Sequence, residues 1–173
     1  ALYELAGLQL QQPGQAGAEE TLTRLLTEHP SHELAHAAFY HRGRIRFERQ
    51  SYAEALTDLE RAAPHLTSET EQAETYFAIG LSRIETQAYP EAVVAFRKVL
   101  SDYPRFPNKD KAQYQLAWAL KLSGQDAEAA RVFESLSRSG RDAAIVAEAK
   151  YHRGDAAFAQ KDYATAITLL QAA

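Results

Sequence analysis

The chain has 173 residues, carries a net charge of −4 at neutral pH and is 46% hydrophobic. An acidic balance disfavours nucleic acid as a partner, because nucleic acid selects basic surfaces. The absence of cysteine excludes disulfides and thiolate chemistry, and no apolar run is long enough to insert into a membrane. We therefore expect one domain, residues 1–173, with a sizeable core.

A period of 37 residues organises the chain from beginning to end. The tetrapeptide Tyr-His-Arg-Gly occurs at residues 40–43 and 151–154, which are 111 residues, or three times 37, apart. A small residue recurs at this period, at Ala6, Gly43, Gly80, Ala117 and Gly154. An alanine follows each of them after twelve residues, and a large apolar residue follows four further on. The period defines five units of approximately 1–35, 36–72, 73–109, 110–146 and 147–173.

Each unit has the pattern of two helices separated by a short break. The breaks fall at residues 50–51, 87–88, 123–125 and 161–162. In the third unit Ala92, Phe96 and Val99 recur at i, i+4 and i+7, which places them on one helical face. We predict about ten helices in antiparallel pairs. The small residues should lie where two helices cross, and the large apolar residues should fill the facing space.

The recurring positions resemble those of the tetratricopeptide repeat. The third unit matches best, with Tyr76, Ile79, Gly80, Ala92, Phe96 and Pro104 at the spacings of the family. The resemblance implies an all-α, right-handed superhelical solenoid of about five helical hairpins that serves as a scaffold for protein–protein interaction. Arg42 and Arg153 depart from the pattern, because they occupy the position of Ile79. We expect each arginine to bury its stem and bring its guanidinium to a carboxylate or to water.

The unit is longer than the common tetratricopeptide repeat of 34 residues. The segment from Phe96 to Pro104 resembles units of bacterial periplasmic proteins, namely the Tol–Pal-associated cell-division coordinator family and the outer-membrane assembly lipoprotein family. This resemblance implies a role in the cell envelope, although a cysteine-free chain suits the cytoplasm equally well. The chain does not begin with methionine, and it stops at Ala173 within an amphipathic pattern. We interpret it as an excerpt of a longer protein.

The resemblance also implies that the first helix of every unit lines a concave groove. Projecting i, i+4 and i+7 from the aromatic position gives the predicted groove residues. They are Tyr40, Arg44 and Phe47; Phe77, Leu81 and Ile84; Tyr114, Trp118 and Lys121; and Tyr151, Asp155 and Phe158. We predict that a protein or peptide partner lies along this groove with Leu81 and Trp118 as its central contacts. The alternative is that the aromatic residues only pack between units.

Two further hypotheses belong to other classes. Residues 32–36 spell His-Glu-x-x-His, in which His32 and His36 would bind zinc and Glu33 would activate water in a hydrolase. Pro30 and Ser31 stand directly before the motif, so we expect it to open a helix with Ser31 as the N-cap, unlike a working site. We predict no catalytic residue, no metal site and no cofactor. The other hypothesis is self-association through apolar ends of the array.

Overall fold

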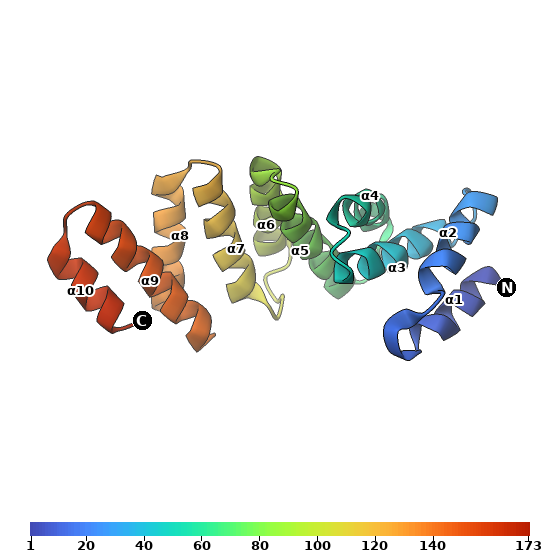
Figure 1. Cartoon of the computed structure of the whole chain (residues 1–173), viewed down its shortest axis with the longest axis horizontal. Helices are drawn as coiled ribbons and strands as arrows, with labels where there is room; N and C mark the ends of the chain where they lie inside the picture. The colour runs from blue at the N-terminus through green and yellow to red at the C-terminus, as the bar shows by residue number, and fades with distance from the viewer. The chain divides into compact units, whose positions relative to one another are not determined.

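The computed structural model describes all 173 residues, and its regular structure consists entirely of helices (Figure 1). The ten α-helices are α1 (Leu2–Leu10), α2 (Ala18–Glu28), α3 (Ala35–Glu48), α4 (Tyr52–Ala62), α5 (Glu69–Glu85), α6 (Tyr89–Asp102), α7 (Lys109–Leu122), α8 (Asp126–Ser139), α9 (Ala143–Ala159) and α10 (Tyr163–Gln171). Two short 3-10 helices, η1 (Pro13–Gln15) and η2 (Ala63–His65), complete the set. The predicted all-α class and the predicted number of helices are confirmed.

The chain forms two compact units, which are described separately below. Unit 1 comprises Ala1–Gln87 with α1 to α5, and unit 2 comprises Ala88–Ala173 with α6 to α10. Within them α1 packs on α2, α3 on α4, α7 on α8 and α9 on α10. In each of these pairs the chain reverses at a short turn, so the partners are antiparallel (Figure 1). The single domain predicted for residues 1–173 stays a prediction. None of the helices combines the length and hydropathy needed to cross a membrane.

The small residues of the repeat mark helix crossings within both units. A Cβ atom added to Gly43 of α3 would lie 2.9 Å from the side chain of Leu59 on α4. A Cβ atom added to Gly154 of α9 would lie 2.7 Å from Leu170 Cγ on α10. Real Cβ contacts are longer than this, so the backbone comes as close as it does because the side chain is missing. The predicted role of the small and large positions is confirmed at both crossings.

The turns inside the helix pairs also follow the period. Four turn residues 37 positions apart adopt positive φ: Gln50 (62°), Gln87 (62°), Gly124 (77°) and Lys161 (65°). After α3, the Gln50 N–H donates to the Phe47 carbonyl at 2.9 Å and the Ser51 N–H donates to the Arg46 carbonyl at 2.8 Å. These two bonds define a Schellman motif, which ends a helix with a left-handed residue. All four breaks predicted from the sequence contain one of these positive-φ residues.

Candidate functional site

In unit 1, the predicted groove residues of α3 pack closely on one another. Tyr40 is only 4% exposed, and burial raises the pKa of its hydroxyl. Arg44 donates a hydrogen bond from Nη1 to the Tyr40 hydroxyl at 3.3 Å, and its guanidinium carbon lies 5.6 Å from the centre of the ring. His41 lies beside this pair, with its ring centre 5.1 Å from that of Tyr40. Tyr40 therefore serves packing, and Arg44 covers it from the solvent side.

Arg44 and His41 also line a small cavity of about 270 Å³ together with Leu10, Gln15, Ile45 and Glu48. Burial lowers the pKa of His41, and the positive charge of Arg44 lowers it further, while Glu71 of α5 acts in the opposite direction. His41 is therefore predominantly neutral at neutral pH. The three predicted groove residues of α5, which are Phe77, Leu81 and Ile84, are all partly exposed.

Two aromatic pairs lie at the turns of helix pairs. Phe47 of α3 packs edge-on against Tyr52 of α4, with ring centres 5.8 Å apart. Phe158 of α9 and Tyr163 of α10 repeat this contact at 5.7 Å. The tyrosines occupy one position of the repeat, so both pairs close the same turn in different units. Phe47 therefore has a packing role, whereas Phe158 remains 60% exposed.

Unit 2 contains a cluster of four rings, which we call the aromatic cluster. It consists of Tyr114 and Trp118 of α7, Phe133 of α8 and His152 of α9, with His152 at its centre. The His152 ring stacks on Phe133 at 4.8 Å and lies 5.4 Å from the Trp118 ring. The Tyr114 hydroxyl and His152 Nε2 are 3.2 Å apart and share a hydrogen bond. Three helices therefore meet around one imidazole.

Burial, together with charges at its edge, sets the protonation of the aromatic cluster. Burial raises the pKa of Tyr114 to about 12, with a smaller contribution from the Glu148 carboxylate. Burial lowers the pKa of His152, and so does the ammonium group of Lys121, whereas Glu148 and Asp155 partly offset both effects. Lys121 Nζ lies 5.7 Å from the centre of the Trp118 ring, within range of a cation–π interaction. At neutral pH the aromatic cluster therefore presents a neutral imidazole and a protonated phenol, and Lys121 lies beside it.

The structure brings some of the predicted groove residues together. Trp118 and Lys121 are in contact, and Trp118 is partly exposed. Tyr151 of α9 is 54% exposed and packs edge-on against His152 at 5.6 Å. Leu81 belongs to unit 1 and Trp118 to unit 2, so their adjacency in one groove stays a prediction.

The sequence interpretation did not assign His152 and Phe133 to this site. The signal was the repeated Tyr-His-Arg-Gly tetrapeptide, whose histidines follow the aromatic position directly. In both copies the histidine contacts the aromatic residue of the unit before it: His41 lies 6.2 Å from Tyr3, and His152 lies 6.0 Å from Tyr114. The tetrapeptide thus encodes a contact between consecutive helix pairs.

A buried network of charges joins α2, α3 and α4 in unit 1. Asp58 is 1% exposed and accepts two hydrogen bonds from Arg42, at 2.8 and 2.7 Å, and one from Arg46 at 2.9 Å. Arg46 also donates to Glu19 of α2 at 3.0 Å. The expectation that Arg42 brings its guanidinium to a carboxylate is confirmed. Arg153 donates to the Ser137 hydroxyl at 2.9 Å and lies 3.6 Å from Glu134, as expected.

The His-Glu-x-x-His motif does not lie within one helix. We expected Ser31 to cap a helix opening at the motif, and this was wrong: α3 begins at Ala35, and its N-cap position is Leu34, which makes no side-chain cap. His32 lies in the preceding turn, where its Nδ1 accepts a hydrogen bond from the Leu34 N–H at 3.1 Å. His36 stacks instead on His65 of η2, with ring centres 3.4 Å apart. This geometry separates the two histidines that a zinc protease needs on one helical face.

Comparison with known proteins agrees with this architecture. A tetratricopeptide repeat profile matches residues 3–69 and 114–173, and a second one matches residues 74–105. The chain belongs to the tetratricopeptide repeat family. Among solved structures, it is similar to MamA (15% identity, TM-score 0.72, 94% of this chain and 92% of MamA covered). It is also similar to YrrB, described as a TPR protein with an unusual peptide-binding site (18% identity, TM-score 0.76, 99% and 82% covered). No curated protein matches the sequence significantly.

Proposed function

We propose that this chain is a scaffold that binds a peptide or protein segment across the first helices of its repeats. Tetratricopeptide proteins generally act as scaffolds for other proteins rather than as enzymes. The observation that carries the proposal is the aromatic cluster, in which Trp118 stays partly exposed beside Lys121. Tryptophan is enriched among residues that dominate binding energy.

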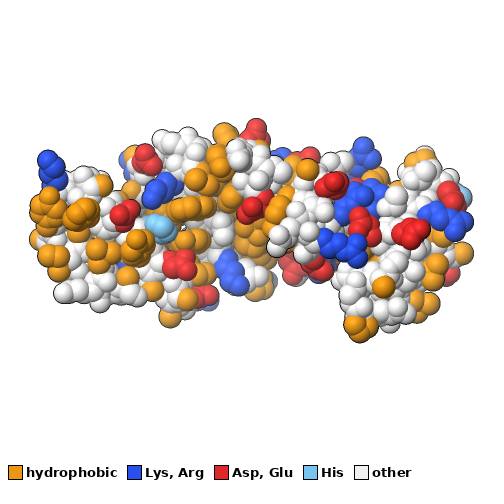
Figure 2. Space-filling model, viewed as in Figure 1, with side chains coloured by type: hydrophobic (Ala, Val, Ile, Leu, Met, Phe, Trp, Pro, Cys, Tyr) orange, Lys and Arg blue, Asp and Glu red, His pale blue; other side chains and the backbone are white.

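The surroundings of Trp118 support this assignment. Tyr151 and Phe158 of α9 are more than half exposed, and exposed apolar surface on one face usually marks an interaction site. Figure 2 shows hydrophobic side chains gathered over the helices α7 to α10 on the face in view. Lys121 and Asp155 add opposite charges, which would orient a ligand more than they strengthen its binding. The proposal extends to Leu81 in unit 1. A role in the bacterial cell envelope rests on the resemblance of residues 96–104 to the units of bacterial periplasmic repeat proteins.

The lone tryptophan of the chain provides the test. Peptides selected from a displayed random library would be labelled with fluorescein and titrated with the protein, and binding would be followed by fluorescence anisotropy, because the Trp118→Ala variant has no tryptophan emission to follow. Trp118→Ala and Leu81→Ala should each weaken binding, the former by about 30-fold, or about 2 kcal/mol, as for a hot spot. The control is Val94→Ala on α6, an apolar residue that is 62% exposed and lies outside the first helices. If Trp118→Ala and Leu81→Ala both stay folded and bind as well as the parent protein, another surface binds the peptide.

A second candidate function is homotypic assembly, and one observation favours it. Leu170 of α10 is 42% exposed, whereas the residues 37 and 74 positions earlier, Phe133 and Phe96, are 3% and 0% exposed. Ile167 on the same helix is also exposed. Sedimentation velocity across concentrations should then show association that Ile167→Asp reduces. A parent protein that stays monomeric at every concentration would exclude this candidate.

A further inference from the structure

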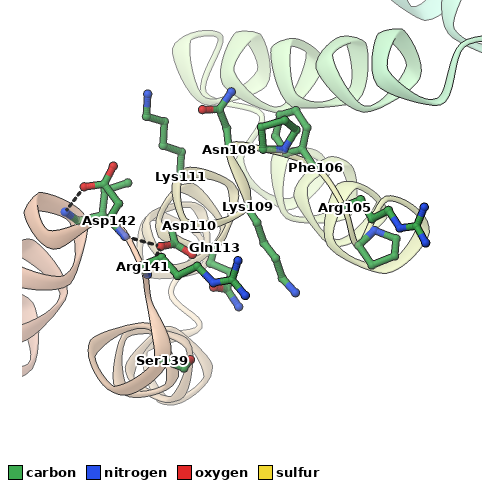
Figure 3. Close-up of a pocket in the computed structure, with 13 residues that line it drawn as sticks. Arg105, Phe106, Asn108, Lys109, Asp110, Lys111, Gln113, Ser139, Arg141 and Asp142 are labelled. Atoms are coloured by element: carbon green, nitrogen blue, oxygen red, sulfur yellow. Dashed lines mark hydrogen bonds between the residues drawn. The ribbon is translucent and has the colours of Figure 1, made fainter.

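Unit 2 has a pocket beside the loops at the N-terminal end of α7, away from Trp118. It has a volume of about 630 Å³ and lies between the segment that joins α6 to α7 and the segment that joins α8 to α9. Four cationic residues line it: Arg105, Lys109, Lys111 and Arg141. We call it the basic pocket (Figure 3). Lys109 precedes Trp118 by nine residues, which is about 13 Å along a helix.

The cations of the basic pocket have no carboxylate partner. None of the four forms an ion pair, although the pocket contains two acidic residues. Asp110 is occupied by backbone groups, because its Oδ2 accepts from the N–H groups of Arg141 and, at 2.8 Å, of Asp142. Asp142 caps α9, where its Oδ1 accepts from the N–H groups of Ala144 and Ile145 at 3.1 and 3.3 Å. The two carboxylates therefore hold the backbone of the loop and the start of α9, and they do not pair with the cations of the pocket.

The direction of the side chains indicates the shape of a ligand. In Figure 3, Lys109 and Arg141 extend to the same side of the pocket, whereas Arg105 and Lys111 extend in other directions. The four cations therefore surround the pocket and do not converge on one point, which suits an extended chain with several charges better than a single small anion. Phe106 is buried, so the pocket offers no exposed ring on which a nucleotide base would stack.

We propose that the basic pocket binds an acidic peptide segment of a partner protein, with carboxylates pairing with Lys109 and Arg141. Arginine recognises carboxylates through two parallel hydrogen bonds, and lysine acts as a point charge. Pro104, Pro107 and Ile145 supply apolar surface for the peptide backbone and its side-chain stems. A cluster of unpaired cations on a chain of net charge −4 also steers an acidic segment towards this site. This surface is separate from the one that contains Trp118.

The test uses a fluorescein-labelled octapeptide of alternating glutamate and serine, with binding followed by fluorescence anisotropy at 20 to 150 mM salt. The parent chain should bind it, and the double variant Lys109→Gln, Arg141→Gln should bind at least tenfold more weakly with a shallower salt dependence. A peptide with glutamine in place of glutamate should not bind. Both substituted side chains are exposed, and circular dichroism melts would verify that the variant stays folded.

The matched control changes the same number of charges outside the pocket. Arg131→Gln with Arg138→Gln removes two exposed cations of α8 and should leave the affinity for the acidic peptide within twofold. If this control weakens binding as much as the pocket variant does, the attraction is nonspecific and the proposal is wrong. If both double variants bind like the parent, the peptide does not use the basic pocket. If pyrophosphate displaces the peptide at equal concentration, the site selects phosphate groups and the peptide assignment is overturned.

Discussion

The α2–α3–α4 junction of unit 1 and the α6–α7–α8 region of unit 2 place different chemistry on the same repeat positions. The buried network of unit 1 consists of Glu19, Arg42, Arg46 and Asp58. The residues two periods, or 74 positions, later are Val93, Leu116, Leu120 and Val132. Three of these four are buried, and the fourth is partly buried. One backbone arrangement therefore accepts either an ion network or an aliphatic core.

This comparison separates the fold from the chemistry placed on it. The small position and its large apolar partner bring the helices together, as at Gly43 and Leu59. The other inward positions can then vary between repeats. On the face shown in Figure 2, acidic and basic side chains gather over α2 to α4 and hydrophobic ones over α7 to α10. The unit with the aliphatic core also carries the aromatic cluster around His152.

The largest loss of stability should follow from replacing one member of the buried network. Asp58→Val leaves the Arg42 guanidinium mostly buried without its carboxylate, and Arg46 loses one of two partners. Removing one partner of a buried pair costs about 3–5 kcal/mol. Urea unfolding at neutral pH would measure the loss. As a control, Glu28→Ala removes an exposed ion pair with Arg24 and should change the free energy of unfolding little.

Replacing the whole network should not lower the free energy of unfolding and can raise it. The quadruple variant Glu19→Val, Arg42→Leu, Arg46→Leu, Asp58→Val gives unit 1 the residues that unit 2 already carries. Replacing a buried ion network by apolar groups of similar volume is often neutral or stabilising by about 1–4 kcal/mol. A quadruple variant that is less stable than Asp58→Val alone would show that the two regions are not interchangeable.

A helix crossing should respond to volume and not to residue type alone. Gly43→Leu inserts a side chain against Leu59, which is fully buried, and overpacking typically costs about 1–3 kcal/mol. Gly7→Leu on α1 is the matched control, because a Cβ atom there meets nothing within 4 Å and leucine favours helix more than glycine does. Thermal melts should separate the two variants. Equal melting temperatures would contradict the assignment of Gly43 to a crossing.

The helix pairs were predictable because the period is free of insertions, so one interpretable turn such as Gln50–Ser51 locates the others. The start of α3 could not be predicted in the same way. Ser31 has the residue type of an N-cap, but the chain forms a further turn at His32 before α3 begins at Ala35. The contact of His152 with Tyr114 joins residues 38 positions apart in different helix pairs, and helical spacing within one element does not reveal it. The basic pocket was not predicted, because its cations come from two separate loops and the first turn of α7, and only folding brings them together.

The turns offer a smaller gain in stability. Gln50 adopts φ 62°, a left-handed conformation that costs a residue with a Cβ atom about 1 kcal/mol and costs glycine almost nothing. The period already places glycine at the equivalent Gly124 of unit 2. Gln50→Gly should therefore raise the melting temperature slightly, and Gly124→Gln should lower it. The pair would fail as a prediction if both substitutions shifted the melting temperature in the same direction.

The smallest effect concerns the two histidines of the repeated tetrapeptide, which have the same role beside different cations. Burial is the main cause that lowers both pKa values below 6.5, with Arg44 as the added cause at His41 and Lys121 at His152. A histidine with a lowered pKa in the folded state disfavours folding once the unfolded chain is protonated. With respect to each histidine, the folded state is therefore most stable above pH 6.5. This stability is lost as the pH falls from 6.5 towards the lower pKa of the folded state.

Nuclear magnetic resonance titration of the imidazole C–H signals would resolve the two sites. Lys121→Gln should raise the pKa of His152 part of the way towards 6.5, because burial remains, and should leave His41 unchanged. Arg44→Gln should raise the pKa of His41 and leave the pKa of His152 unchanged. If either substitution moves both histidines equally, a change in folding and not a local charge is responsible. If neither moves its own histidine, burial accounts for the whole shift, and the cations serve only the Tyr40 and Trp118 rings that they cover.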